Sequence, residues 1–344
     1  MTVLGLDIGT NYTKATKDGK DVILFPSLVV YGEEKDWSLK GETRDVYIGE
    51  EAAAIAANME NVEVLRPLHE GRLIHQSYIE IAKYVFSKLG RADIIATGLP
   101  VKSSRKERDE VATALKRNLA SDVLLFPQPV GTLAHLGYDT GVCVDIGFGT
   151  TDLVVIASME YLKGDTMLVG VDKIYENLEI SVRNKAGMSI TPEEMAKLLL
   201  DKDYQVGRIR GGKKVVITHS EIMEEYSEII TGWADRIANR VKMLLEGLST
   251  SLVDKIVLTG GGSALPGVYE EFSRQFEDIG NIEVPDDPLT ANARGYYALA
   301  KLFAESSDVE VSEEGEVEEA AETADEVVKK AEKVKGEGKK SRKK

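Results

Sequence analysis

The sequence predicts an α/β fold with two similar lobes, because one strand–turn–strand pattern occurs twice. The apolar run at residues 3–8 leads into Asp7-Ile-Gly9, and a second apolar run at residues 141–146 leads into Asp145-Ile-Gly147, 138 residues further along. A second β-like run follows each triplet, so each pattern predicts a hairpin. Two similar hairpins at this separation indicate a duplicated fold with one hairpin in each lobe. The length of 344 residues also corresponds to about two domains.

Strands and helices alternate through the first lobe, as they do in α/β proteins. Apolar residues at helical spacing indicate the helices, and short β-like runs bounded by Gly, Pro or polar residues indicate the strands. The elements expected after the hairpin are helices at 50–57, 78–89 and 106–119, strands at 93–98 and 123–126, and a helix of small residues from Gln128 to Gly137. Residues 32–46 are polar and are expected to form a surface excursion.

The second lobe begins with the hairpin at residues 141–156. The elements expected beyond it are helices at 173–186, 227–248 and 291–303 and a strand at 255–259. Residues 207–214 are rich in Gly, Arg and Lys, and we expect a basic loop there.

The composition argues against several classes of protein. A net charge of −15 indicates no basic footprint for nucleic acid in the folded part. The single cysteine, Cys143, cannot form an internal disulfide and is expected to be buried, which fits a reducing, cytoplasmic compartment. The sequence shows no signal peptide, membrane span or strong amphipathic anchor, so no membrane contact is expected.

The composition changes after the last expected helix. Residues 305–328 hold 11 acidic residues and no Lys or Arg, whereas residues 329–344 hold nine Lys or Arg. The Val and Ala residues of this segment recur at helical spacing and could form a short, weak helix, but such a helix would bury little apolar surface, which favours a disordered tail. We therefore expect residues 304–344 to be a disordered, charged tail, which is also a candidate site for an adaptor protein.

The glycine-rich turns are the candidate sites of chemistry. A nucleotide polyphosphate needs backbone N–H groups that approach closely, which favours Gly and small hydroxyl residues in tight turns. Both hairpins supply such residues, namely Gly9, Thr10 and Asn11 in the first and Gly147, Gly149, Thr150 and Thr151 in the second. Either hairpin alone could be a plain strand turn. The duplication, together with a third glycine-rich turn at residues 260–263, favours a nucleotide site.

Charged residues lie beside both turns. Hydrated Mg²⁺ is commonly held by carboxylates, and Asp7 and Asp145 each end a β-run. Facing hairpins would bring these two carboxylates to opposite sides of one metal ion. Lys14 could reach back to the terminal phosphates as a point charge.

The motifs themselves carry a family resemblance. Residues 7–14 resemble the first phosphate motif of the actin, heat-shock-70 and sugar-kinase superfamily, residues 145–152 its second phosphate motif, and residues 256–267 its adenosine motif. The seven-residue spacing from Asp7 to Lys14 is that of the actin-like branch, and the chain looks similar to plasmid-segregation and archaeal actin-like proteins. The resemblance implies a duplicated ribonuclease-H-like, actin-type fold. Its lobes would span residues 1–138 and 139–303 around a nucleotide cleft, with the last helix packed back on the first lobe.

The resemblance also implies roles for individual residues. Mg²⁺ would be held through water by Asp7 and Asp145, and Gln128 would orient the attacking water. Only one glycine, Gly170, stands where the family has a Gly-Gly or Ala-Gly turn, and Asp152 is expected to be a structural residue of its hairpin. The residues implied in nucleotide binding are Gly9, Thr10, Asn11, Tyr12, Lys14, Gly147, Gly149, Thr150, Thr151, Gly170, Gly261, Gly262 and Ser263.

The function implied by the resemblance is that of an ATPase that binds Mg-ATP between its lobes and assembles into nucleotide-dependent cytoskeletal filaments, for DNA or plasmid segregation, cell shape or scaffolding. The alternative is a small-molecule kinase of the same superfamily that does not polymerise. Such a kinase usually needs an acidic base, and Gln128 is a poor proton acceptor. The preference between ATP and GTP stays open at this level.

Overall fold

The computed structural model describes residues 1–31, 45–58, 63–69, 72–73, 75–120 and 122–306. The chain divides into the units Met1–Ala300 and Lys301–Lys344, and every sheet belongs to the first. The predicted excursion at 32–46 falls almost entirely outside the described residues, and so does the predicted tail from residue 307 onward.

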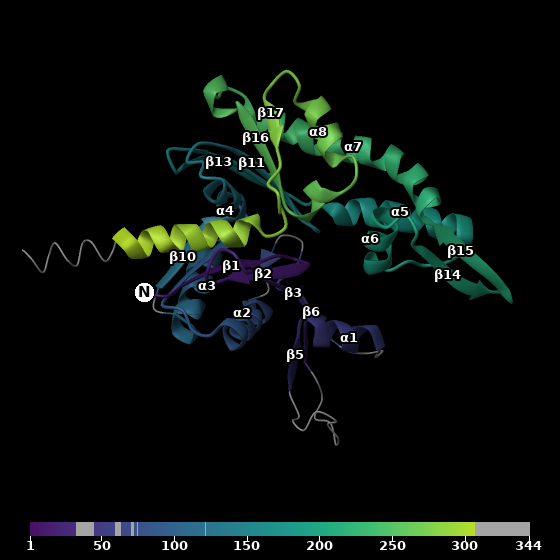
Figure 1. The fold of residues 1–344 in the computed structure, drawn as a ribbon, viewed down its shortest axis with the longest axis horizontal. Coiled ribbons are helices and arrows are strands. Elements are labelled where there is room, and N and C mark those ends of the chain that lie inside the picture. The colour runs from purple at the N-terminus through teal and green to yellow at the C-terminus, as the bar shows by residue number, and fades with distance from the viewer. Residues whose placement is uncertain (32–44, 59–62, 70–71, 74, 121, 307–344) are drawn as a thin grey trace, which may run out of the picture. The chain divides into compact units, whose positions relative to one another are not determined.

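The first sheet has the strand order β10-β9-β1-β2-β3. Figure 1 labels four of these strands, β1, β2, β3 and β10. Its strands are β1 (Val3–Ile8), β2 (Tyr12–Thr16), β3 (Ile23–Pro26), β9 (Ile94–Leu99) and β10 (Asp122–Pro127). β1, β2 and β3 form an antiparallel meander, and β9 lies parallel to β1 on its other side. The helices α2 (His75–Leu89) and α3 (Arg105–Asn118) share a hydrophobic core with this sheet.

The second sheet repeats this topology, with the order β13-β12-β11-β16-β17. Its strands are β11 (Gly141–Ile146), β12 (Thr151–Ala157), β13 (Glu160–Met167), β16 (Lys255–Thr259) and β17 (Asn281–Glu283). Again three strands, β11, β12 and β13, form an antiparallel meander, and β16 lies parallel to β11 on its other side. The duplication expected from the two hairpins is therefore confirmed at the level of whole sheets.

A larger core covers the second sheet. It involves α5 (Val171–Ala186), α6 (Pro192–Leu200), α7 (His219–Leu245) and α8 (Val268–Gln275), together with the short 3₁₀ turn η1 (Thr250–Leu252). A second 3₁₀ turn, η2 (Gly261–Ala264), follows β16. α7 begins eight residues earlier than predicted, because Thr218 and Glu221 form a capping box at its start. Cys143 is buried in a smaller cluster beside α4 (Gln128–His135), as expected.

Smaller elements extend from each sheet. In the first lobe these are β4 (Val29–Tyr31), β5 (Val46–Ile48), α1 (Glu50–Asn58), β6 (Val64–Leu65), β7 (Leu68–His69) and β8 (Arg72–Leu73). In the second lobe they are α6 and a hairpin of β14 (Gln205–Arg210) and β15 (Lys213–Thr218).

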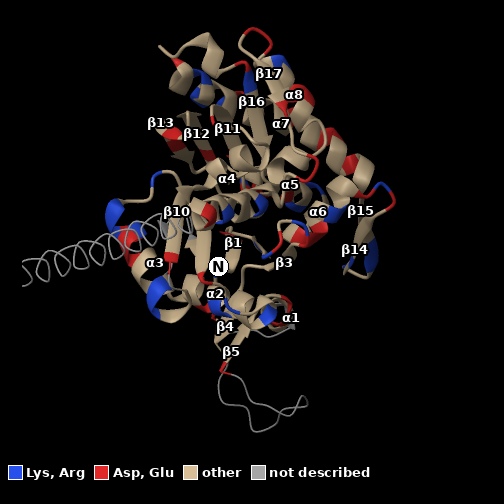
Figure 2. Ribbon diagram, turned by 60° about the vertical axis from the view of Figure 1, so that its left-hand side comes forward, with Lys and Arg blue, Asp and Glu red and all other residues tan. Residues whose placement is uncertain are grey.

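The prediction of a basic loop at residues 207–214 is wrong, because this stretch forms most of the β14–β15 hairpin (Figure 2). Val206 and Ile217 are buried on one face, while the basic residues between them are mostly exposed. Gly211 and Gly212 both have positive φ and make the tight turn. The density of Arg and Lys hid the apolar residues of the two strands, of which Val206 and Ile217 are buried.

The helix at residues 291–306 crosses α4 at very close range. A Cβ on Gly295 would lie 1.6 Å from the carbonyl oxygen of Gly131, so only glycine fits there. A Cβ on Gly5 would likewise lie 2.1 Å from the carbonyl oxygen of Ala293. These contacts fix where Gln128 and Asn292, near the N-terminal ends of their helices, lie relative to β1. The predicted lobe boundary at residue 138 stays a prediction.

Candidate functional site

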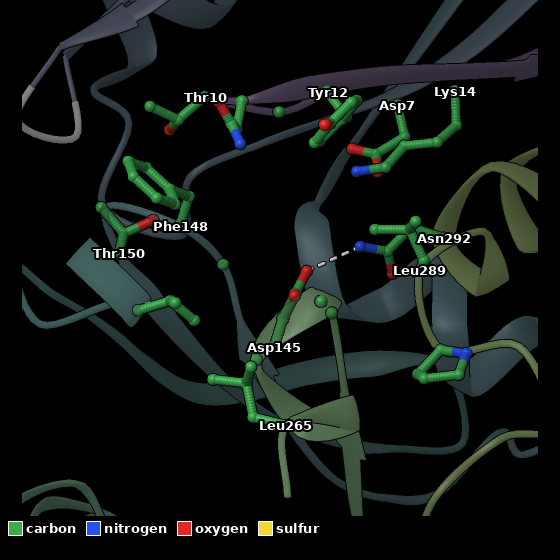
Figure 3. A pocket seen from close by; sticks show the side chains of 18 of the residues that line it. Asp7, Thr10, Tyr12, Lys14, Asp145, Phe148, Thr150, Leu265, Leu289 and Asn292 are labelled. Atoms are coloured by element: carbon green, nitrogen blue, oxygen red, sulfur yellow. Dashed lines mark hydrogen bonds and ion pairs between the residues drawn. The ribbon is translucent and has the colours of Figure 1, made fainter. Parts of the chain in front are cut away.

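A cavity of about 420 Å³ lies where the glycine-rich turns of the two sheets meet (Figure 3). Twelve of the predicted site residues line it, and they come from both hairpins, from the start of α4 and from the turn after β16. These are Asp7, Gly9, Thr10, Asn11, Tyr12, Lys14, Gln128, Asp145, Gly147, Thr150, Gly261 and Gly262. Segments more than 100 residues apart in the chain therefore meet at one site.

Four other predicted residues lie behind the lining. Thr151 is buried and its hydroxyl donates to the carbonyl of Val169 at 2.6 Å, and the Ser263 hydroxyl donates to the carbonyl of Gly260 at 2.8 Å. A Cβ on Gly170 would lie 2.2 Å from the Phe148 carbonyl oxygen, and a Cβ on Gly149 would lie 3.7 Å from the side chain of Thr10. The four residues therefore contribute to the backbone conformation and packing of the turns.

The first hairpin places a cation beside its carboxylate. Asp7 and Lys14 are direct partners in the β1–β2 register, and the Lys14 ammonium lies 3.1 Å from Asp7 Oδ2. Both side chains are buried. The turn itself is closed by the Gly9 amide, which donates to the Tyr12 carbonyl at 3.1 Å.

The second hairpin has the same backbone but a different charge. The Gly147 amide donates to the Thr150 carbonyl at 2.9 Å, as in the first turn. The residue opposite Asp145 in the β11–β12 register is Asp152, so two carboxylates occupy the positions of Asp7 and Lys14. Burial raises the pKa of Asp145 to about 7, and the negative charges of Asp7 and Asp152 contribute to this rise.

Asp152 does more than the structural role predicted for it. It lines the cavity, and its Oδ1 accepts from the Val101 amide at 2.9 Å and from the Thr166 hydroxyl at 2.6 Å. Burial raises its pKa to about 6. It therefore ties the second hairpin to the loop that follows β9. Its position, seven residues after Asp145 as Lys14 is after Asp7, was a signal in the sequence for a residue at the site.

Asn292 is a lining residue that the sequence motifs did not reveal. Its side-chain nitrogen donates to Asp145 Oδ2 at 2.6 Å, which Figure 3 marks with a dashed line, and its oxygen accepts from the amide and the hydroxyl of Thr132. This side chain fixes the orientation of Asp145 against α4. The available signal was a single Asn among the small residues of the last helix.

The glycine-rich turn after β16 packs closely against Asp145. Gly260 has a φ of +79°, and a Cβ there would lie 2.3 Å from Asp145 Oδ1, so glycine is required on both grounds. Beyond this turn the lining becomes apolar, with contributions from Leu265, Leu289, Ala196 and Leu200. These apolar side chains give part of the lining a surface that suits a flat apolar ring.

The charged part of the lining fits a hydrated divalent cation. Asp7, Asp145 and Asp152 bring three carboxylates to the lining, and Lys14 is the only lysine among the lining residues. Oxygen ligands and excess negative charge suit Mg²⁺, which usually keeps several waters. Among the described residues no group of three or more His, Cys, Asp or Glu converges tightly enough to chelate a metal directly.

Comparison with known proteins assigns the family. The family model described as MreB/Mbl protein matches residues 1–308. The chain belongs to the MreB/Mbl family. Among its relatives, the cell shape-determining protein MreB of Escherichia coli (strain K12) is 24% identical over 326 residues, covering 85% of this chain and 91% of the relative. The cell shape-determining protein Mbl of Bacillus subtilis (strain 168) is 23% identical over 324 residues, covering 85% and 93%.

Solved structures of MreB/Mbl-like and other actin-like proteins share the fold. MreB5 of Spiroplasma citri bound to ADP superposes with a TM-score of 0.72 at 20% identity, covering 89% of this chain and 98% of that one. Ta0583, an archaeal actin homolog, gives 0.68 at 24% identity, covering 88% and 99%. The predicted actin-type fold and the prokaryotic actin-like branch are both confirmed.

The names of the MreB and Mbl relatives refer to the determination of cell shape, and neither name mentions plasmid segregation. Within the described part of the chain, no helix is long and apolar enough to cross a membrane.

Proposed function

We propose that this member of the MreB/Mbl family binds Mg-ATP in the cavity between its two hairpins, hydrolyses it, and assembles into nucleotide-dependent cytoskeletal filaments. The observation that carries the proposal is that two hairpins of equivalent backbone bring Asp7 and Asp145 to one cavity. The solved structures support the choice of ligand, since MreB5 of Spiroplasma citri has been solved bound to ADP and bound to AMPPNP.

Different lining residues are suited to contact the phosphates, the metal ion and the base. The turn residues of both hairpins belong to the charged part of the lining, where backbone amides can approach phosphate oxygens. Lys14 supplies positive charge there, and Asp7 and Asp145 hold the hydrated Mg²⁺, which neutralises charge on the phosphates. The apolar part, with Leu265 and Leu289, takes the base.

Gln128 is the residue that we assign to positioning the attacking water. It lies at the start of α4, lines the cavity and is 7% exposed. Its backbone carbonyl accepts from the buried Tyr296 hydroxyl at 2.7 Å, which fixes the position of its backbone. An amide can orient a water molecule but is a poor base, which suits hydrolysis better than deprotonation of a second substrate.

Filament assembly is supported by the relatives. The double helical filament of MamK has a TM-score of 0.70 with this chain, at 20% identity and covering 87% of it and 98% of the MamK chain. The cell-shape role in the names of the MreB and Mbl relatives favours a cytoskeletal task for this chain.

The test is sedimentation and right-angle light scattering of the full chain with Mg²⁺ and ATP, ADP or no nucleotide, together with phosphate release. We expect assembly with ATP, and loss of phosphate release with retained assembly in Gln128→Ala. Glu228→Gln, an exposed change outside the cavity lining, is the control. A monomer that consumes ATP only when a small hydroxylated substrate is added would overturn the proposal in favour of a kinase.

A further inference from the structure

The β14–β15 hairpin is a basic, exposed element that the proposed function does not use (Figure 2). Residues 205–216 hold four Arg or Lys and no acidic residue, in a chain whose net charge is −15. One of the four, Arg208, pairs with Glu194 of α6 at 2.8 Å. The others are exposed and form no ion pair within the part of the chain that the structure describes, namely Arg210, Lys213 and Lys214. Most of the positive charge of the hairpin is therefore available to a partner.

The outer edge of β14 is not paired with any strand that the structure describes. The hairpin is a two-stranded sheet, and the elements packed against it, α5, α6 and α7, are helices. Along β14, Ile209 stands between two arginines and is 73% exposed. An edge strand leaves backbone N–H and C=O groups free to pair with a further strand, and charges on the edge repel strands that do not carry the opposite charge. The edge of β14 therefore suits an extended, acidic segment with an apolar residue at its centre.

The acidic segment that follows the last helix contains such a stretch. Residues 308–311 read Asp-Val-Glu-Val, within a region, residues 305–328, that holds 11 acidic residues and no Lys or Arg. Successive side chains of a strand point to opposite faces, so in a strand Asp308 and Glu310 would share one face and Val309 would lie on the other.

The alternation in β14 has the same period and the opposite charge. Its residues 208–210 read Arg-Ile-Arg, against Asp-Val-Glu at residues 308–310. With the two stretches side by side in either direction, each acidic residue lies opposite an arginine, and Val309 lies opposite Ile209. Pairs of opposite charge and apolar pairs across neighbouring strands both stabilise a sheet.

Within one chain, the acidic stretch follows closely on a part of the body that lies away from the hairpin. Leu299 of the last helix packs in a cluster with Phe126 of β10, whereas the hairpin contacts α5, α6 and α7 (Figure 1). Asp308 follows Leu299 by nine residues, and a stretch of this length spans at most about 30 Å. This short reach favours the hairpin of a neighbouring copy, which an assembled filament would bring close.

We propose that residues 308–311 of one copy add as a third strand to the edge of β14 in a neighbouring copy, and that this contact strengthens assembly. The two acidic residues then face Arg208 and Arg210, and Val309 covers the exposed Ile209. The inference rests on the proposed function, because it requires neighbouring copies in a filament.

The contact itself can be measured without assembly. A fluorescein-labelled peptide of residues 305–314 is titrated with the full chain, and its fluorescence anisotropy is followed. We expect Arg210→Glu/Lys213→Glu to weaken binding about tenfold, because like charges then face each other across the strands. Lys202→Glu/Arg236→Glu makes the same change of charge at exposed positions outside the hairpin and should have little effect.

The order of residues in the peptide tests the added strand. A peptide of the same composition in scrambled order keeps the charge and loses the alternation, so it should bind several times more weakly. Equal binding of the two peptides would show that net charge alone holds them, and would overturn the added strand. Absence of binding by the natural peptide would overturn the contact altogether.

Sedimentation with Mg-ATP tests whether the contact joins two copies. The hairpin variant Arg210→Glu/Lys213→Glu and the tail variant Asp308→Lys/Glu310→Lys should each sediment less than the wild type. In an equimolar mixture, every contact between unlike chains has opposite charges again, so the mixture should sediment more than either variant alone. Recovery only when one chain carries both sets of changes would place the contact within a single chain and overturn the inference.

A second tail variant, Glu313→Lys/Glu314→Lys, is the matched control. It changes the charge of the tail by the same amount outside the alternating residues, and it should lower sedimentation clearly less. An equal loss would overturn the added strand. Normal assembly of the hairpin and tail variants would overturn this inference alone, whereas failure of the wild-type chain to assemble with ATP would contradict the proposed function.

Discussion

The two hairpins share their backbone and differ in charge. In each, a glycine amide closes the turn on the carbonyl three residues on, and the residue seven positions after the aspartate lies directly opposite it. That residue is Lys14 in the first hairpin and Asp152 in the second. The two copies therefore have the same shape of phosphate turn, while the charge at one equivalent position is reversed.

Because of this reversal, the negative charge is neutralised to different extents in the two hairpins. Asp7 is already neutralised by Lys14 at 3.1 Å, whereas Asp145 faces Asp152 and is supported by the neutral side chain of Asn292. The second half therefore carries most of the uncompensated negative charge. A divalent cation should depend more on the second hairpin, and the first hairpin should depend more on its internal ion pair.

Removing Lys14 tests this difference most strongly. Lys14→Met leaves Asp7 buried without a counter-ion, and breaking a buried pair in this way costs about 3 kcal/mol. We expect the free energy of unfolding of the nucleotide-free protein, measured in urea, to fall by that amount. The double variant Asp7→Asn/Lys14→Met should regain most of it. A loss below about 1 kcal/mol in the single variant would show that water solvates Asp7.

Neutralising Asp145 in the second hairpin should change stability with the opposite sign from neutralising Asp7 in the first. The pKa of Asp145 is about 7 in the fold against an ordinary value of 3.8, so the folded state binds its proton more tightly than the unfolded chain. In the metal-free protein the contribution of this group to stability is greatest at low pH and is lost as the pH rises from about 4 to 7.

Asp145→Asn removes the carboxyl group that titrates, so the variant should not lose stability in this way as the pH rises. At pH 8 without Mg²⁺ we expect the variant to be more stable than wild type by about 2 kcal/mol, and the difference to disappear below about pH 4. Thermal or urea unfolding across this pH range measures it. Asp7→Asn is the matched control, and because it breaks an ion pair it should destabilise at pH 8. Equal signs for the two variants would contradict the charge difference between the hairpins.

Asp152→Asn isolates the charge at the reversed position. The amide oxygen can still accept from the Val101 amide and the Thr166 hydroxyl, so the link to the loop after β9 is kept while one negative charge is lost. We expect the Mg²⁺ concentration needed for half-maximal ATP binding to rise about fivefold, a loss of roughly 1 kcal/mol. Thr166→Val, which removes the hydroxyl and keeps the charge, should leave this Mg²⁺ dependence unchanged. A Mg²⁺ dependence unaffected by Asp152→Asn would show that the charge of Asp152 does not act on the metal.

Alanine substitutions in the turns test the shared backbone, and their effects should be no larger than this. A Cβ on Gly9 would lie 3.0 Å from the Tyr12 carbonyl oxygen, and a Cβ on Gly147 would lie 3.0 Å from the Thr150 carbonyl oxygen. Gly9→Ala and Gly147→Ala should therefore each cost about 1 kcal/mol, and to a similar extent, in nucleotide-free unfolding. A clear inequality between the two would show that the turns are not equivalent.

The duplicated fold could be predicted from the sequence, because the two Asp-Ile-Gly turns and the alternation of helices and strands are local patterns. Ten of the residues that line the cavity could be predicted in the same way, since glycine-rich turns and the charged residues beside them can be recognised from neighbouring residues alone. Tyr12 and Gln128 were implied by the family resemblance. The wrong prediction at β14–β15 was local too, because a high density of Arg and Lys hid the apolar residues of the hairpin, in which Val206 and Ile217 are paired and buried.

The contacts between distant segments at the site, in contrast, depend on long-range packing. Asn292 reaches Asp145 across 147 residues of sequence, Asp152 binds the backbone of Val101, and Arg66 supports the turn at Thr10 and Asn11. The close crossing of α4 and the last helix at Gly131 and Gly295 places two of the lining side chains, Gln128 and Asn292. The physical reason is that burial and charge depend on distances between segments far apart in the chain, and no local pattern contains those distances.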